Sequence, residues 1–324
     1  MTGLSERFKD LPDYILRITR EIWEDRGIDT LHRYYGQDMP VRSPAGVVVG
    51  NQGVIAATMA TLAEFPDRTL LGEDVIWSGN GDAGFLSSHR LLSTATHSGD
   101  GVYGRATGTK LRYRIIADCA VRDDTIYDEW LIRDQSAIVR QMGQEPRDYA
   151  RDLIAREGGP EACVRPLTPV SDVPPVYTGR GNDDEWGLRY AEILTRVMGA
   201  EFSLIERTYD RACQLEHPGG ATGHGRGAAD RFWLGLRAAL PDARFEIHHV
   251  IGRDDPMMPP RAAIRWSLHG THSGWGAFGR PSGAEIYVLG ISHAEFGPWG
   301  LRREWVLFDE TAIWKQILLK TGDA

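Results

Sequence analysis

Two glutamates in matching sequence settings are the first candidates for acid–base chemistry. Glu129 and Glu304 each stand directly before a tryptophan in a segment typical of a β-strand. Alternate side chains of a strand point to opposite faces, so Glu129 is predicted to share the inner face with Leu131 and Arg133. A carboxylate facing an apolar interior has a raised pKa, which suits it to transfer protons. Glu129 is therefore predicted to be catalytic and Glu304 to contact the substrate.

Polar side chains on the predicted strand 85–97 extend this set. Alternation places His89, Ser93 and His97 on the inner face of the first half of the chain. We expect His89 and His97 to act as catalytic groups and Ser93 to bind substrate. The alternatives are structural: an inward histidine is often a hydrogen-bonded core residue, and His97 precedes Gly99, where it could hold the following loop.

Three further residues are candidates with an alternative for each. Asp118 is a catalytic candidate if a β-bulge turns it inward, whereas simple alternation turns it outward. Tyr113 faces inward and could hydrogen-bond a substrate carbonyl or a backbone group. Arg42 is predicted to bind substrate, or to form a structural ion pair with Glu129. In the second half, Trp266 and His272 are the inward candidates for substrate binding.

The chain repeats itself at an offset of 175 residues. The motif Thr96-His97-Ser98-Gly99 recurs at residues 271–274, and Glu129-Trp130 recurs at residues 304–305. Between residues 34 and 134, about 20 of roughly 101 positions are identical without a gap. So long a period indicates two copies of one domain. The copies differ inside, because Ile264 replaces His89, so any polar ligand is expected in the first copy.

The order of predicted elements favours an α+β fold in each copy. Helices are expected over residues 12–27, 29–35 and 51–65, followed by strands over 70–77, 85–97, 110–121 and 125–133 and a closing helix over 135–142. Helices followed by a meander of strands indicate an antiparallel sheet. The glycine-rich run 219–227 lacks the spacing of a phosphate-binding loop and is predicted to be a loop before a helix.

We divide the chain into a first domain over residues 1–145, a helix and linker over 146–183, and a second domain over 184–324. The linker is rich in proline and glycine. It is long enough for the two domains to pack together as an intramolecular pseudo-dimer with approximate two-fold symmetry, and a further homo-oligomer is compatible with this arrangement.

Several segments resemble one known family. These are LPDARFEIHHVIG, AAIRWSLHGTHSG and GISHAEFGPWGLRREWVLFDETAIWKQI in the second copy, and EFPDRTLLGEDVI, SSHRLLSTATHSG and IADCAVRDDTIYDEWLIRDQSAIVRQMG in the first. They are similar to the SnoaL-like polyketide cyclases of the nuclear transport factor two-like superfamily. The resemblance covers residues 34–143 and 209–318. It implies two tandem cone-shaped domains, each with helices packed into a strongly curved sheet around an apolar pocket.

The resemblance also implies where a catalytic pair would lie. In SnoaL-type cyclases an acidic residue and a histidine occupy positions that fall here on Leu131 and Ala117 in the first copy, and on Val306 and Ser292 in the second. Neither copy keeps the pair. This departure argues against aldol cyclisation by the family mechanism. From the inward carboxylate and histidine groups we expect a cofactor-independent acid–base enzyme, a lyase, isomerase or cyclase, acting on a small apolar or carbonyl-bearing compound. The alternatives are a non-catalytic small-molecule binder and a structural module with filled pockets.

Composition argues against other classes of protein. The net charge of −8 disfavours nucleic acid or an anionic membrane as a partner. The three cysteines are scattered, so neither a disulfide framework nor a zinc site is indicated. No HExxH, CxxC or EF-hand pattern occurs, and we expect no metal and no other cofactor. No apolar run is long enough for a membrane span, and the cytoplasm is the expected compartment. A small-molecule ligand is the expected partner.

Overall fold

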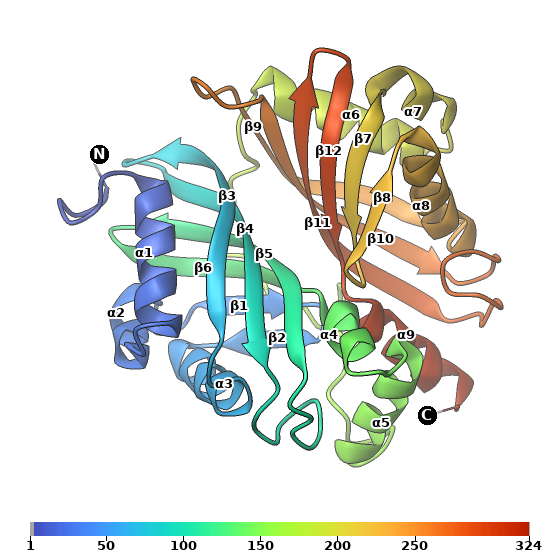
Figure 1. The fold of residues 1–324 in the computed structure, drawn as a ribbon, viewed down its shortest axis with the longest axis horizontal. Helices are drawn as coiled ribbons and strands as arrows, with labels where there is room; N and C mark the ends of the chain where they lie inside the picture. The colour runs from blue at the N-terminus through green and yellow to red at the C-terminus, as the bar shows by residue number, and fades with distance from the viewer. Residues whose placement is uncertain (1–2, 324) are drawn as a thin grey trace. The chain divides into compact units, whose positions relative to one another are not determined.

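A computed structural model describes residues 3–323 of the chain. These form two compact units, each built on a six-stranded sheet (Figure 1). The first unit ends at Glu145 but also includes Leu167–Gly179, and the second consists of Pro146–Pro166 and the chain from Arg180 onward. The prediction of two tandem α+β domains with curved sheets is confirmed.

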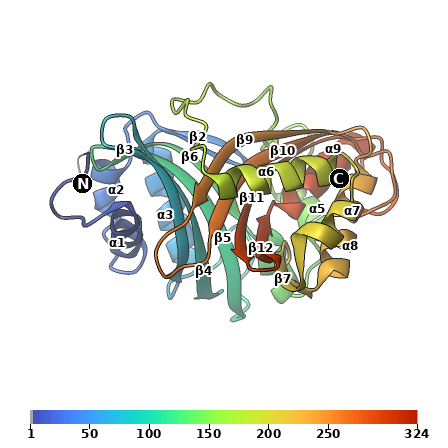
Figure 2. The same ribbon diagram turned by 90° about the horizontal axis from the view of Figure 1, so that it is seen from above.

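The first unit follows the predicted order of helices and then strands. In chain order its elements are α1 (Leu11–Trp23), a 3-10 turn (Ile28–Thr30), α2 (Leu31–Tyr34), β1 (Pro40–Ser43), β2 (Gly46–Val49), α3 (Asn51–Glu64), β3 (Thr69–Asn80), β4 (Gly84–Thr96), β5 (Lys110–Arg122), β6 (Thr125–Arg133) and α4 (Gln135–Gln141). The side chain of Asp10 caps α1 by accepting a hydrogen bond from the Asp13 amide. Helices α1, α2 and α3 lie beside this sheet (Figure 2).

The sheet of the first unit has the strand order β2-β1-β6-β5-β4-β3. All neighbouring strands are antiparallel except β1 and β6, which run parallel with Val41 opposite Glu129. The predicted antiparallel meander thus describes β3 to β6, and the hairpin β1–β2 adds to it through one parallel pair. This pairing places β1 beside β6. Both strands, together with α3, which follows β2 in the chain, then surround one interior.

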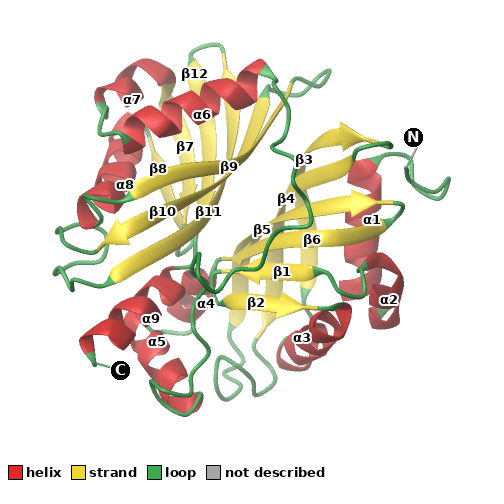
Figure 3. Ribbon diagram, turned by 180° about the vertical axis from the view of Figure 1, so that it is seen from behind, coloured by secondary structure: helices red, strands yellow, loops and turns green. Residues whose placement is uncertain are grey.

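The second unit repeats this plan. Its elements are α5 (Pro146–Arg156), α6 (Glu185–Met198), α7 (Ser203–Thr208), β7 (Tyr209–His217), β8 (Ala221–His224), α8 (Arg226–Ala239), β9 (Arg244–Arg253), β10 (Arg261–Thr271), β11 (Glu285–Gly297), β12 (Gly300–Leu307) and α9 (Glu310–Thr321). The strand order is β8-β7-β12-β11-β10-β9, and α6 lies across the sheet (Figure 3). Among the described residues of the chain, no helix has both the length and the apolar character to cross a membrane.

Strand register repeats with the same offset as the sequence. His89 is paired with Val75 and Ala117, and Ile264, 175 residues later, is paired with Val250 and Ser292. The central strands of the two sheets can therefore be compared residue by residue.

The repeated Thr-His-Ser-Gly motif is part of the scaffold. The Thr96 and Thr271 amides donate hydrogen bonds of 2.7 and 2.8 Å to Asp67 and Asp242. The glycine of the motif packs against the preceding helix, where a Cβ on Gly99 would lie 2.2 Å from the Ala63 carbonyl oxygen. The motif thus fixes the end of the strand against the helix in both copies.

The glycine-rich run of the second unit differs from its prediction. Residues 221–224 form β8, whose Gly223 lies opposite Leu215 of β7, and α8 begins at Arg226. The prediction of a continuous loop was wrong because glycine is tolerated in a short strand at the edge of a sheet, where few side chains are needed for packing.

Candidate active site

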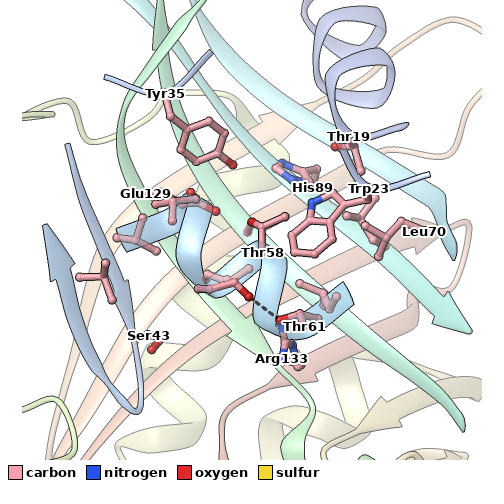
Figure 4. Close-up of a pocket in the computed structure, with 18 of the residues that line it drawn as sticks. Thr19, Trp23, Tyr35, Ser43, Thr58, Thr61, Leu70, His89, Glu129 and Arg133 are labelled. Carbon is pink, nitrogen blue, oxygen red and sulfur yellow. Dashed lines mark hydrogen bonds between the residues drawn. The ribbon is translucent and has the colours of Figure 1, made fainter. Parts of the chain in front are cut away.

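A cavity of about 230 Å³ lies inside the first unit, between α1, α3 and the inner face of the sheet (Figure 4). Its wall is mainly apolar. The polar and charged side chains that line it are Thr19, Tyr35, Ser43, Thr58, Thr61, Arg68, His89, Glu129 and Arg133. Polar groups that converge among apolar side chains are typical of small-molecule sites. Predicted strand alternation is confirmed here, because Glu129, Leu131 and Arg133 of β6 all face this interior.

Glu129 reaches the cavity from the middle of β6, where it lies opposite Cys119 and is 5% exposed. Burial raises the pKa of Glu129 to about 7, and hydrogen bonding with Tyr35 and Cys119 opposes this rise. The pKa of the Tyr35 hydroxyl is itself raised well above its usual range, mainly by burial, so this group stays protonated and can donate. The Glu129 carboxyl is therefore a mixture of ionised and protonated forms at neutral pH.

His89 faces the same cavity from β4 and is also 5% exposed. Its Nδ1 lies 3.1 Å from the Ser87 hydroxyl oxygen, which orients the ring. Burial lowers the pKa of His89 to about 4, so the imidazole is neutral at pH values where Glu129 titrates. The sequence thus brings a neutral imidazole and a titrating carboxyl to one cavity.

Two arginines line the cavity that were not among the predicted site residues. Arg68 follows α3, is 4% exposed, and holds its guanidinium 4.2 Å from the Trp23 ring centre. Arg133 ends β6 on the Glu129 face. Alternation along β6 points to Arg133. No sequence periodicity points to Arg68, because it lies in a turn.

Ser93 and Tyr113 lie next to these arginines but do not line the cavity. The Arg68 Nε donates to the Ser93 hydroxyl at 3.3 Å, and Ser93 is paired with Tyr113 across β4 and β5. Burial acts to raise the pKa of Tyr113, but the charges of Arg68 and Arg133 outweigh it and lower this pKa. Both predicted substrate-binding residues therefore support arginines that reach the cavity.

Arg42 is placed differently from either prediction. Val41 faces the cavity, so its neighbour Arg42 points to the other face of the sheet. There Arg42 is buried and forms ion pairs with Asp128 and, at 2.6 Å, with Asp172. It therefore neither lines the cavity nor pairs with Glu129, and its contacts are those of a residue that holds the 167–179 segment on this unit.

Asp118 and His97 also lie away from the cavity. Asp118 is opposite Trp130 with no bulge at that point, so simple alternation holds and the side chain faces outward. Both ring nitrogens of His97 are occupied, Nδ1 at 3.0 Å from the Thr107 hydroxyl and Nε2 at 3.2 Å from Glu64. The structure places His97 as a loop-holding residue and Asp118 on the opposite face from Glu129.

In the second unit, aromatic side chains fill the corresponding interior. Trp233 and Trp266 take the places of Thr58 and Leu91, and both are fully buried. The Trp266 ring fits because Gly290 replaces Ile115; a Cβ at Gly290 would lie 2.2 Å from the ring. Trp266 thus belongs to a packed core.

Glu304 and His272 are held within that second core. Glu304 accepts hydrogen bonds from the Tyr190 and Tyr209 hydroxyls at 2.8 and 2.7 Å, and burial raises its pKa to about 7. The His272 Nδ1 lies 3.0 Å from the Ser282 hydroxyl, as His97 does from Thr107. Neither residue borders the cavity of the first unit.

The positions implied by the family resemblance do reach the first cavity. Ala117 and Leu131 are paired across β5 and β6, and both line it. Their side chains are apolar, but polar groups lie beside them: His89 is paired with Ala117 across β4 and β5, and Glu129 stands two residues before Leu131 on β6. Among residues 3–323, no three histidine, cysteine, aspartate or glutamate side chains are grouped as a metal site requires.

Comparison with known proteins gives two family matches in tandem. Residues 13–142 match the SnoaL-like polyketide cyclase family, and residues 190–302 match the SnoaL-like domain family. No protein of curated function matches the sequence.

Solved structures similar to part of the chain include IdmH from Streptomyces antibioticus, with 24% identity over 41% of this chain and 98% of that chain, at a TM-score of 0.35. A SnoaL-like polyketide cyclase from Agrobacterium tumefaciens shows 22% identity over the same shares, with a TM-score of 0.33. TsrD from Streptomyces laurentii shows 16% identity over 41% of this chain and 94% of that chain, with a TM-score of 0.36.

Proposed function

Because this chain belongs to the SnoaL-like polyketide cyclase family, with two domains in tandem, we propose that its first domain is a cofactor-independent acid–base enzyme acting on a small carbonyl compound. The observation that carries this proposal is the placement of Glu129 and His89 on one cavity, with Glu129 titrating near pH 7. A carboxyl with such a pKa both accepts and donates protons efficiently at neutral pH.

The elementary step is proton removal from a carbon next to a carbonyl group. The Glu129 carboxylate takes the proton, the C–H electron pair becomes the carbon–carbon double bond of an enolate, and the negative charge moves to the carbonyl oxygen. Neutral His89, oriented through Nδ1 by Ser87, donates its Nε2–H to that oxygen. Return of the proton elsewhere gives isomerisation, loss of a β-substituent gives elimination, and attack on a second carbonyl gives cyclisation.

The second domain is assigned no reaction in this proposal. Its counterpart of Glu129 is enclosed by two tyrosines and Trp233, and its counterpart of His89 is Ile264. The difference between the two interiors supports a division in which the first domain binds the ligand.

A non-catalytic binding protein is the second candidate. The apolar Ala117 and Leu131 favour it, because they stand where the family resemblance implies a catalytic histidine and acid. In this case Glu129 and His89 would only hydrogen-bond a ligand, and no proton transfer to carbon would occur.

Deuterium exchange separates the two candidates. The full-length protein is incubated in deuterated buffer with 4-oxopentanoate and with its uncharged analogue 2-pentanone, and proton NMR follows the signals next to the ketone. Exchange faster than in protein-free buffer supports the enzyme. Ligand binding without exchange supports the binding protein, and the absence of both contradicts each candidate.

We also propose the intramolecular pseudo-dimer expected from the sequence. Its support is the tandem repetition of one domain and the linker between the copies. Small-angle scattering of the full-length chain tests it. A compact monomer supports the pseudo-dimer, whereas two domains separated by an extended linker contradict it.

A further inference from the structure

Arg68 and Arg133 bring two positive charges to the cavity, and neither forms a direct ion pair with a carboxylate among the described residues. Burial acts to lower the pKa of Arg133, but Tyr103, Tyr113 and the charge of Glu64 outweigh it and raise this pKa. Arg68 forms no ion pair among the described residues, and its Nη1 has no hydrogen-bond partner. The Nε of Arg133 likewise has none. A buried guanidinium with unpaired donors is costly, because burial removes water that is not replaced.

The other buried arginines of this unit, Arg42 and Arg90, form ion pairs with carboxylates. Arg42 has Asp128 and Asp172, while Arg90 and Arg114 share Glu73 at 2.9 Å each. The two arginines that line the cavity thus differ from the buried Arg42 and Arg90 in having no direct ion pair with a carboxylate among the described residues.

The second unit has no equivalent of this pair. Ala243 stands in place of Arg68 and Phe308 in place of Arg133 in a fold with the same strand register. The fold therefore does not require positive charge at these positions, which separates the pair from the scaffold.

We propose that Arg68 and Arg133 bind the carboxylate of a small organic acid whose apolar part extends toward Glu129. Arginine donors in a dry cavity match a planar carboxylate, which accepts two parallel hydrogen bonds. That this acid is a substrate rests on the proposed function, whereas the carboxylate site itself is a proposal about binding alone.

The size and polarity of the cavity limit the ligand further. A cavity of about 150 Å³ holds benzene, so the 230 Å³ observed here suits one ring or a short chain with a carboxylate. Glu129 and Arg133 are four residues apart on β6, about 13 Å along an extended strand. A compound of this size can place its carboxylate by the arginines and its reactive carbon nearer Glu129.

Titration calorimetry of the full-length protein with benzoate tests the proposal, with benzamide as the uncharged analogue and inorganic phosphate as a second anion. We expect benzoate to bind at least about tenfold more tightly than benzamide, from charge-assisted hydrogen bonds. Arg133→Phe introduces the residue found at the equivalent position of the second domain, Phe308, and should abolish the preference for benzoate. Arg68→Lys should reduce this preference only in part. Arg105→Met, an exposed arginine of the same unit, is the control.

Benzoate and benzamide binding equally, or benzoate binding unchanged in Arg133→Phe, would overturn the proposal, as would phosphate binding more tightly than benzoate. Circular dichroism establishes that each variant is folded, and Arg68→Lys keeps the test usable if Arg133→Phe does not fold. Glu129→Gln should retain benzoate binding. Failure of the anion site therefore shows in calorimetry, whereas failure of the proposed function shows in deuterium exchange.

Discussion

Glu129 and Glu304 occupy the same register position in two sheets, but Glu129 lines the cavity of the first unit whereas Glu304 is fully buried. Glu129 lies opposite Cys119 and Glu304 opposite Ala294, 175 residues later in each case. Burial raises the pKa of both to about 7. Two tyrosine hydroxyls and Trp233 surround Glu304 with donors. The same carboxylate is thus part of a packed core in one domain and accessible to a ligand in the other.

Glu129→Gln should change how stability depends on pH. The folded-state pKa of Glu129 is raised, so its contribution to stability is full below about pH 4.5 and is lost as pH rises through about 7. Near pH 5 the variant should match the wild type within about 1 kcal/mol, as for a near-isosteric replacement. Above pH 7 the free energy of unfolding of the variant should exceed that of the wild type by up to about 3 kcal/mol. Urea unfolding at several pH values measures this, and a variant less stable at high pH would point to a structural ion pair instead.

Thr58→Trp should fill the cavity without unfolding the protein. Trp233 occupies the equivalent position in the second domain, so the fold accommodates this side chain there. We expect benzoate binding to be lost and stability to change by no more than about 3 kcal/mol, the usual range for overpacking. Calorimetry and thermal unfolding measure the two effects. Unchanged binding would show that the ligand lies elsewhere.

Arg42→Met should weaken the first domain but spare its cavity. The substitution leaves Asp128 buried without its ion-pair partner, for which a loss of about 3–5 kcal/mol is expected. Urea unfolding gives the stability, and benzoate affinity of the folded fraction should stay within about twofold of the wild type. A much larger loss of benzoate affinity in folded Arg42→Met would indicate that Arg42 contributes to the ligand site.

The rate of deuterium exchange should rise with pH through about 7. Glu129 must be ionised to accept the proton, and its pKa is raised to that value by burial. His89 has its pKa lowered to about 4, so it adds no second transition near neutrality. Exchange rates of 4-oxopentanoate from about pH 5 to 9 measure the profile. A rate that falls through pH 7 would indicate that protonated Glu129 limits the reaction.

Much of the fold could be predicted from the sequence because its signals are local and repeated. Strand alternation predicted the inner face that carries Glu129, Leu131 and Arg133, and the 175-residue offset holds in the strand register. The repeated histidine of the Thr-His-Ser-Gly motif was less informative about chemistry. Residues shared by both copies, such as His97 and Asp67, hold loops and strand ends.

The cavity itself depends on packing that sequence periodicity does not report. Whether the interior is open is decided by side-chain volume from several elements, as when Thr58 in the first domain is replaced by Trp233 in the second. Arg68 enters the site from a turn, where no pattern fixes its direction. Arg42 was expected inward, but the register of β1 against β6 turns it to the other face.

The most direct test of the central claim compares matched variants of the two glutamates in one assay. Full-length wild type, Glu129→Gln and Glu304→Gln are each incubated with 4-oxopentanoate in deuterated buffer near pH 7, and proton NMR measures exchange next to the ketone. We predict exchange by the wild type, at least about a hundredfold loss in Glu129→Gln, as expected for loss of a general base, and near wild-type rates per folded protein in Glu304→Gln. Exchange by Glu129→Gln at the wild-type rate would contradict the assignment of proton transfer to the first domain.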